Sequence, residues 1–228
     1  MLEIIRSDSP QATVHIIDDD PNLRMSLLNF FESTAICADA FGTADEFLDN
    51  ADLSLPGCIL LDVRLPGMTG IELQARLKAM GYPLPIIFMS GNANVAISVH
   101  AMKEGAFDFL LKPFDGETLI ETTLLAFKRN LELRDQTAAF LQSRACVETL
   151  TPRETEVFAY VSEGMMNKQI AYEMKISEIM VKLHRGRMMK KLQARSLVDV
   201  VRKFDQMHEA KRMKVDTTRP LEVEDLRS

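Results

Sequence analysis

Residues 58–67 read CILLDVRLPG, an apolar run that closes with an acidic residue and leads into a Pro-Gly turn. The run from Cys58 to Leu61 lacks the alternation of a half-exposed strand, which is typical of central strands that are buried on both faces. Asp62 is therefore expected at the end of a buried strand, where ligand sites form in open α/β sheets. This position makes Asp62 the first candidate for a functional residue.

Three other strand-like runs also end in polar side chains. If all four runs are parallel strands, their polar residues meet at one edge of the sheet. A cluster of carboxylates costs repulsion unless a cation lies among them, so acids together with a hydroxyl and an ammonium predict a metal and phosphate site. The three runs are residues 13–17 before Asp18 and Asp19, residues 86–89 before Ser90, and residues 107–111 before Lys112.

Stretches with helix-like spacing of apolar residues alternate with these runs. Repeated strand and helix units imply an α/β domain with a doubly wound, five-stranded parallel sheet that is covered on both faces. We expect helices at residues 22–33, 43–49, 70–80 and 95–104, and one that begins near residue 116.

The chain has 228 residues, enough for two ordinary domains, and its net charge of −6 hides an asymmetry. Residues 1–123 hold 7 Lys and Arg against 18 Asp and Glu, whereas residues 151–203 hold 11 against 6. The basic segment suits a polyanion such as nucleic acid, although such a charge is also typical of a solvated surface. The cysteines and histidines show neither a disulfide framework nor a zinc pattern. With no membrane-length apolar run and no signal segment, we expect a cytoplasmic protein without a membrane partner.

Residues 118–144 contain neither Pro nor Gly and mark the boundary between the domains. Leu124, Phe127 and Leu131 recur there at helix-like spacing, which predicts a long last helix that runs into a helical linker at residues 124–147. The first domain is accordingly placed at residues 1–123. The sequence leaves open whether the long helix pairs with a copy of itself or packs on its own sheet.

A second domain of short helices is expected at residues 148–208. Thr151, Pro152 and Glu154 form a helix start signal, because the threonine and glutamate side chains satisfy N–H groups that are otherwise unpaired. Residues 209–228 are poor in apolar side chains and are expected to form a mobile tail. The helices are expected from Pro152 to Gly164, at 167–174, from Ser177 to about Leu192 after a turn at Lys175-Ile176, and from Ser196 with Asp199 in its cap.

The helix expected after Ser177 combines an apolar face with a basic one. Val181, Met188 and Leu192 point inward on a 3.6-residue helix, with His184 nearby. The opposite face can enter the major groove of DNA, where cations reach phosphates or guanine edges and a glycine permits close approach. A solvated basic face is the alternative. The candidate DNA contacts are Lys168, Lys182, Leu183, Arg185, Gly186, Arg187 and Lys190.

Asp62 can attack a phosphoryl group if nearby charge is neutralised, which would give an aspartyl phosphate. Mg²⁺ suits this task because it takes oxygen ligands and bridges carboxylate and phosphate. Ser90 and Lys112 would hold the remaining phosphate oxygens through a hydroxyl hydrogen bond and a positive charge. The expected Mg²⁺ ligands are Asp19, Asp62 and the backbone carbonyl of Arg64, with Asp18 acting through water.

Each of these residues also has a simpler explanation when it is taken singly. Asp18 or Asp19 beside Pro21 suits a helix cap. Ser90 suits a turn, and Lys112 suits a surface charge. Their occurrence together at four strand ends favours the site.

Two stretches carry a family resemblance, LDVRLPGMTGIELQ at Leu61–Gln74 and AMKEGAFDFLLKPF at Ala101–Phe114. With the four strand ends, they make residues 12–125 resemble the receiver domain of two-component response regulators, most closely those of the NarL/FixJ type. The resemblance implies a flavodoxin-like fold in which Asp62 accepts a phosphoryl group from a sensor histidine kinase.

The same resemblance implies roles for other residues. Asp18 and Asp19 would help to bind Mg²⁺, and the Lys112–Pro113 peptide bond is expected to be cis. Ser90 would move toward the phosphate and Phe109 would turn inward behind it, so these two residues form the expected switch.

Four stretches of the second domain carry another resemblance: LTPRETEV at 150–157, NKQIA at 167–171, VKLH at 181–184 and KKLQARSL at 190–197. Through them, residues 148–204 resemble the LuxR-type helix-turn-helix. This implies double-stranded DNA as a partner. It also makes the helix from Ser196 the expected dimerisation surface.

The sequence departs from these families at three places. Asn92-Ala93-Asn94 follows Ser90-Gly91, where a histidine and an acid are usual. The lifetime of the phosphoryl group and the choice of kinase therefore do not follow from the family. Met180 replaces a common threonine and Gln169 a common glutamate. The DNA target therefore does not follow from the family.

These observations predict a transcription regulator, not an enzyme, that is controlled by phosphorylation of Asp62. The expected partners are a sensor histidine kinase, double-stranded DNA, RNA polymerase and, after phosphorylation, a second copy of the chain. One alternative is a phosphatase that forms an aspartyl phosphate. Such hydrolases usually carry Asp-x-Asp with the nucleophile on the first strand, whereas Asp62 is separated from Asp18-Asp19. A protein-interaction adaptor is the other alternative.

Overall fold

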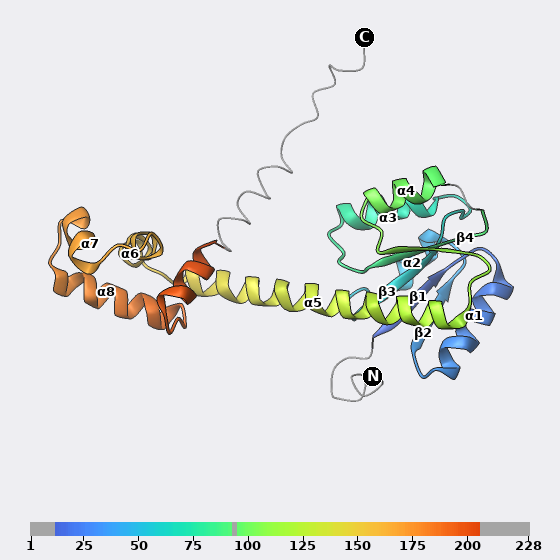
Figure 1. Ribbon diagram of the computed structural model, residues 1–228, viewed down its shortest axis with the longest axis horizontal. Helices are drawn as coiled ribbons and strands as arrows, with labels where there is room; N and C mark the ends of the chain where they lie inside the picture. The colour runs from blue at the N-terminus through green and yellow to red at the C-terminus, as the bar shows by residue number, and fades with distance from the viewer. Residues whose placement is uncertain (1–11, 93–94, 206–228) are drawn as a thin grey trace, which may run out of the picture. The chain divides into compact units, whose positions relative to one another are not determined.

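The computed structural model describes residues 12–92 and 95–205, and the chain divides into two compact units, Met1–Asp135 and Gln136–Ser228 (Figure 1). Strands and helices alternate along the first unit. Its elements are β1 (Thr13–Ile17), α1 (Pro21–Ser33), β2 (Cys37–Phe41), α2 (Ala44–Asn50), β3 (Gly57–Asp62), α3 (Gly70–Ala79), β4 (Ile86–Ser90), α4 (Val95–Lys103), β5 (Asp108–Leu111) and α5 (Gly116–Glu148).

The strands form one parallel sheet in the order β2-β1-β3-β4-β5, so the predicted doubly wound, five-stranded α/β fold is confirmed. Strand β3 is buried along its whole length, as its continuous apolar run predicted. Ile59 and Leu61 face the core that contains residues of α2, α3 and α4. Cys58 and Leu60 face the core that contains residues of α1 and α5. Helices therefore cover both faces of the sheet.

The strand register brings the candidate residues to one edge of the sheet. Ile17 at the end of β1 pairs with Leu61 in β3, and Ser90 at the end of β4 pairs with Leu111 in β5. The strands all run in the same direction, so their carboxyl ends meet there. The polar residues at or just after these ends are Asp18, Asp62, Ser90 and Lys112.

Helix α5 continues without a break through the predicted linker at residues 124–147. Phe127 packs in the core beneath the sheet. The buried Asn130 accepts a hydrogen bond from the backbone N–H of Gly57 at 3.1 Å, and Arg134 donates to backbone carbonyls of residues 53–55. These contacts lie within the first compact unit, which runs to Asp135.

The second unit contains α6 (Pro152–Ser162), α7 (Asn167–Met174), α8 (Glu178–Lys191) and a helix at residues 197–205. Thr151 and Glu154 form a capping box at the start of α6, as predicted. Gly164 and Lys175 take positive φ angles of 83° and 54°, which let the chain turn after α6 and α7. The predicted small all-α domain is confirmed.

The predicted tail at residues 209–228 lies outside the described residues, as do Ala93 and Asn94. Within 12–92 and 95–205, no helix is both long and apolar enough to span a membrane.

Candidate functional site

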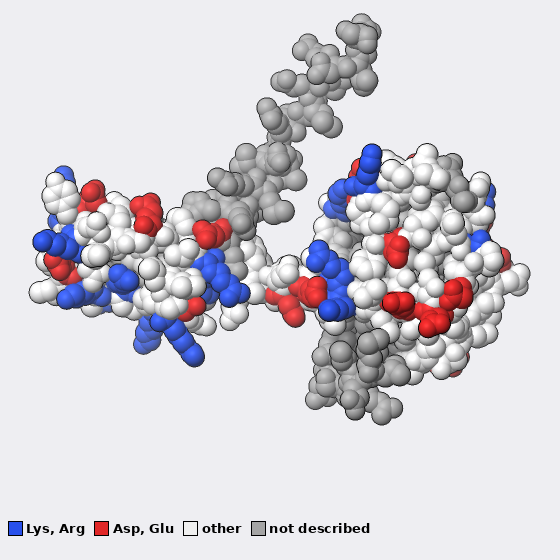
Figure 2. Space-filling view, viewed as in Figure 1, with Lys and Arg blue, Asp and Glu red and all other residues white. Residues whose placement is uncertain are grey.

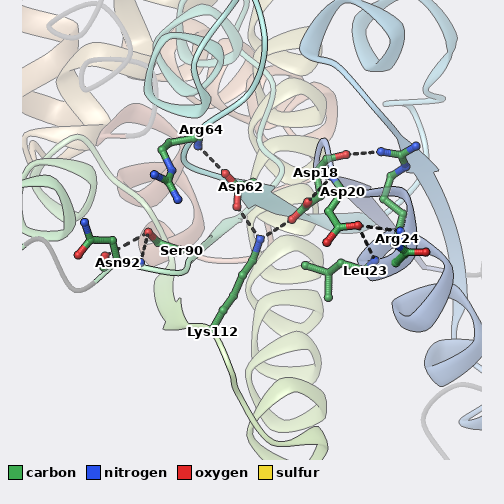
Figure 3. A network of polar contacts seen from close by, with 10 residues as sticks. Asp18, Asp20, Leu23, Arg24, Asp62, Arg64, Ser90, Asn92 and Lys112 are labelled. Carbon is green, nitrogen blue, oxygen red and sulfur yellow. Dashed lines mark hydrogen bonds and ion pairs between the residues drawn. The ribbon is translucent and has the colours of Figure 1, made fainter.

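Asp62 lies at the end of β3 and contacts Lys112, which follows β5 (Figure 3). The Lys112 Nζ atom is 2.5 Å from Asp62 Oδ1 and 2.5 Å from Asp18 Oδ2. Asp18 is 1% exposed and Asp62 7%, so both carboxylates are largely removed from water. One ammonium therefore offsets the charge of one of the two buried acids at the carboxyl edge of the sheet and leaves one negative charge.

The charge on Lys112 is stabilised by this pairing. Partial burial lowers its pKa, but the hydrogen bonds and charges of Asp18 and Asp62 outweigh burial and leave the pKa above its ordinary value. Lys112 is therefore a cation at neutral pH.

The backbone after Asp62 holds its second oxygen. The N–H of Arg64 donates to Asp62 Oδ2 at 2.5 Å, and the N–H of Gly70 donates to the Val63 carbonyl at 3.1 Å. A Cβ at Gly70 would lie 2.3 Å from the Asp62 carbonyl oxygen, so only glycine lets α3 begin this close to the site. The turn between β3 and α3 thus fixes the orientation of the Asp62 carboxylate.

The three acids after β1 have different environments. Asp18 is buried and accepts the backbone N–H of Asp20 at 2.9 Å, whereas Asp19 is exposed. Asp20, rather than Asp18 or Asp19, caps α1 by accepting N–H bonds from Asn22 and Leu23. The helix-cap alternative is therefore wrong for Asp18 and Asp19.

Oxygen donors from Asp18 and Asp62 are close enough to contact one cation. Within the described ranges, no three Asp, Glu, His or Cys side chains are grouped to hold a metal ion. Two carboxylates and backbone carbonyls are nevertheless the hard oxygen donors that suit Mg²⁺. The donor chemistry fits the ion, and the structure brings together two of the three predicted carboxylates.

Ser90 and Phe109 lie on neighbouring strands β4 and β5. The Ser90 hydroxyl donates to the Asn92 carbonyl at 3.2 Å and accepts the Asn92 N–H at 3.3 Å. Phe109 is half-buried and stacks on Phe88 with ring centroids 6.2 Å apart. The Lys112–Pro113 bond is cis, which confirms the prediction from the resemblance.

Helix α8 presents the predicted division between an apolar and a basic face. Val181, Met188 and Leu192 are fully buried, and His184 is half-buried. The outward candidates Lys182, Leu183, Gly186, Arg187 and Lys190 are all exposed, and so is Lys168 on α7. Figure 2 shows Lys and Arg side chains over the visible face of this unit.

Two features of this face were not predicted. Arg185 is half-buried and donates to Asn167 Oδ1 at 2.9 Å, so it joins α8 to α7 within the domain. Ile179 is 76% exposed on α8. Its spacing of four residues from Leu183 is the sequence signal that places it on the outward face.

Comparisons with known proteins match both units. The family model of the response regulator receiver domain matches residues 14–124, and that of bacterial regulatory proteins of the luxR family matches residues 148–204. The chain belongs to the two-component response regulators. It is of the NarL/FixJ type, with a LuxR-type DNA-binding domain, and this family consists of transcription regulators rather than enzymes.

Response regulators from several bacteria are similar to this chain over most of its length. Nodulation protein W of Bradyrhizobium diazoefficiens is 41% identical over 85% of this chain and 86% of its own length. Response regulator protein TodT of Pseudomonas putida is 36% identical over 90% of this chain and 91% of its own. Transcriptional regulatory protein FixJ of Azorhizobium caulinodans is 38% identical over 83% of this chain and 90% of its own length.

Two solved structures of response regulators extend the likeness to the fold. The response regulator StyR has a TM-score of 0.76 and 37% identity, covering 86% of this chain and 99% of its own. Full-length FixJ from B. japonicum has a TM-score of 0.53 and 35% identity, and the match covers 88% of this chain and 99% of the FixJ chain. Both matches span the receiver and DNA-binding regions of this regulator.

Proposed function

We propose that phosphorylation of Asp62 switches this response regulator and controls its binding to double-stranded DNA. The observation that carries the proposal is the contact of Lys112 Nζ with both Asp18 and Asp62 at 2.5 Å. Two acids and one cation are gathered where an added phosphoryl group and a divalent cation compensate each other's charge. This arrangement supports a phosphoacceptor role better than a purely structural ion pair.

The phosphoryl group comes from a phosphohistidine of a sensor kinase. An oxygen of the Asp62 carboxylate attacks phosphorus, the N–P bond of the phosphohistidine breaks, and the imidazole takes a proton from solvent. The Arg64 N–H holds Asp62 Oδ2 and leaves Oδ1, the oxygen now bonded to Lys112, as the nucleophile. Lys112 and Ser90 then bind phosphoryl oxygens.

Mg²⁺ is the proposed cofactor of this site. When bound, it would supply positive charge that offsets the negative charge of the carboxylates and of the incoming phosphoryl group. The proposed ligands are Asp19, Asp62 and the backbone carbonyl of Arg64, with Asp18 holding the ion through water.

Ser90 and Phe109 form the proposed switch. The hydroxyl of Ser90 now bonds to the backbone of Asn92, and a phosphoryl oxygen on Asp62 is a stronger, charged acceptor. Ser90 therefore exchanges its partner, and Phe109 turns inward behind it. Because the phosphoryl group interacts better with this second state, phosphorylation shifts the population toward it.

The phosphorylated form dimerises and binds DNA. Dimerisation through the helix at residues 197–205 suits a two-fold DNA site. The proposed DNA contacts are Lys168, Lys182, Leu183, Arg185, Gly186, Arg187 and Lys190. The bound dimer acts with RNA polymerase in the cytoplasm.

Binding of duplex DNA by the full chain, with and without an acyl phosphate donor and Mg²⁺, tests the coupling. We expect phosphorylation to raise the affinity of the wild type and to leave Asp62→Asn unchanged. Equal gains in both proteins would contradict the switch.

The DNA surface is tested by Lys182→Ala combined with Arg187→Ala. The slope of log affinity against log salt is negative, and each lost phosphate contact should make it shallower by about 0.9. A control, Arg76→Ala with Lys103→Ala, removes the same charge from the receiver domain and should keep the slope. If no salt-sensitive DNA binding is found at all, the adaptor function is favoured instead.

A further inference from the structure

Three exposed apolar side chains lie on α8 beside its basic residues. Ile179 is 76% exposed, Leu183 43% and Met180 41%. Ile179 and Leu183 are four residues apart and are therefore neighbours on one ridge of the helix, which continues to Arg187. Exposing apolar surface to water is unfavourable, and here it adjoins the cations of the proposed DNA surface. The surface therefore suits a binding partner that is a polyanion and that also carries apolar groups.

The outward face of α8 changes character along the helix. Its first turns carry the apolar side chains, and its later turns carry Arg187 and Lys190. Between them, a Cβ at Gly186 would meet nothing within 4 Å, so the middle of the face is open to close approach. The described side chains at residues 179–190 include no Asn, Gln, Ser, Thr, Asp or Glu. Apart from the cations and Glu178 at the first position of α8, this exposed face therefore has only apolar contacts with which to distinguish bases.

We infer that Ile179, Met180 and Leu183 read thymine methyl groups in the major groove. Among the four base pairs of unmodified DNA, the only methyl group in the major groove belongs to thymine. Lys182 and Arg187 flank the apolar ridge and would contact phosphates, which position the helix but carry no sequence information. The inference rests on the proposed DNA-binding function and deepens it by naming the chemistry that is read.

This assignment predicts the composition of the target. Each half-site should contain T·A pairs opposite the first turns of α8. A guanine should lie opposite Lys190, because Lys pairs well with guanine O6 and N7, whereas Arg187 contacts a phosphate. A target chosen by phosphate contacts alone would show no such preference.

Replacing thymine by deoxyuridine tests the inference directly, because deoxyuridine lacks only the methyl group. The full chain first selects its sites from a pool of random duplexes, and each thymine of the selected site is then replaced singly. We expect about a fourfold loss of affinity at one or more thymines per half-site. This is the effect of losing the burial of one methyl group.

Variants assign the effect to side chains. Ile179→Ser and Leu183→Ser should bind the thymine and deoxyuridine forms equally at the position that each reads. Met25→Ser is the control, because Met25 is an apolar residue that is 59% exposed on α1 of the receiver domain, and it should keep the wild-type ratio. The measured quantity is the ratio of a variant's affinities for the thymine and deoxyuridine forms. A substitution that weakens binding to both forms equally leaves this ratio unchanged.

The outcomes separate the inference from the function on which it rests. If wild-type affinity is salt-sensitive but unchanged by every thymine replacement, methyl reading is wrong and DNA binding stands. If the Ser variants still discriminate as the wild type does, other residues read the methyl groups and the assignment is overturned. If no salt-sensitive duplex binding occurs, the proposed function itself fails.

Discussion

Gly70 determines how closely α3 approaches Asp62. A Cβ at this position would lie 2.3 Å from the backbone oxygen of Asp62, so Gly70→Ala should displace the turn and destabilise the receiver domain by about 1–3 kcal/mol. Gly186→Ala is the matched control, because nothing lies within 4 Å of its Cβ and alanine is the better helix former by about 1 kcal/mol. Urea denaturation measures both changes, and equal effects of the two substitutions would show that the close approach at Gly70 is unimportant.

Asp18 supplies a test of metal binding that does not depend on phosphorylation. An ion that binds only the folded chain stabilises it by RT ln(1 + [L]/Kd), about 1.4 kcal/mol at ten times Kd. MgCl₂ should therefore raise the melting temperature of the wild type above its value in NaCl of equal ionic strength, and Asp18→Asn should reduce this gain. A gain of the same size in the variant would exclude Asp18 from the metal site.

Polar side chains at strand ends were the part of the site that could be predicted from the sequence. Asp62, Ser90 and Lys112 were predicted at one edge because each follows an apolar run, and the parallel register places them there. The bond between Arg185 and Asn167 was not predictable, because it joins two helices whose separation depends on packing of the whole domain. Long-range contacts of this kind leave no periodic signal in the sequence.

Among the elements, α5 is attached to the sheet by a polar contact at its middle. Asn130 is fully buried, and Arg134 donates to it and to three backbone carbonyls of residues 53–55. Arg134→Ala leaves these carbonyls without a charged donor, so we expect a loss of about 1–3 kcal/mol and faster amide exchange near residues 51–56. Arg129→Ala, which removes only an exposed pair with Glu132, should cost less than about 1 kcal/mol. Unchanged exchange in the Arg134 variant would mean that α5 is held by apolar packing alone.

Glu154 and Lys191 join α6 to the end of α8, with Oε2 and Nζ 2.6 Å apart. The hydrogen bond from Lys191, followed by that from the Thr151 backbone, holds the pKa of Glu154 below its ordinary value of 4.5. A carboxyl with a lowered pKa in the folded state stabilises the fold above its unfolded pKa, and this contribution is lost as pH falls through the folded pKa. The stability difference between wild type and Glu154→Gln should therefore be about 2 kcal/mol at pH 7, the value of a hydrogen bond to a charged group, and shrink below about pH 4.5. A difference that does not change with pH would contradict the ion pair.

Helices and strands with a regular pattern of apolar residues could be predicted from the sequence, and an element without such a pattern could not be predicted from its own residues. The helices and the four apolar strands follow the periods of the sequence, whereas β2 reads CADAF and carries no apolar run. It is an edge strand that pairs only with β1, so it needs little burial, and its existence followed from the alternation of elements rather than from its own residues. The length of α5 followed from the absence of Pro and Gly, but its attachment through Asn130 did not.

At the scale of the whole molecule, the chain joins an acidic receiver domain to a basic helical domain. The charge asymmetry in the sequence, 7 basic against 18 acidic residues in 1–123 and 11 against 6 in 151–203, coincides with this division. In the proposed function, the kinase acts on the first unit and DNA binds the second, so the effect of one on the other passes through a change in population of two states. In the proposed switch, this change depends on one covalent event, the phosphorylation of Asp62.

Labelling of the full chain by a radioactive acyl phosphate in the presence of Mg²⁺ measures that event most directly. We expect a single label on the wild type, the same label on Asp45→Asn, which changes an exposed carboxylate of α2, and no label on Asp62→Asn. Undiminished labelling of Asp62→Asn would contradict it, because the phosphoryl group would then lie on another residue.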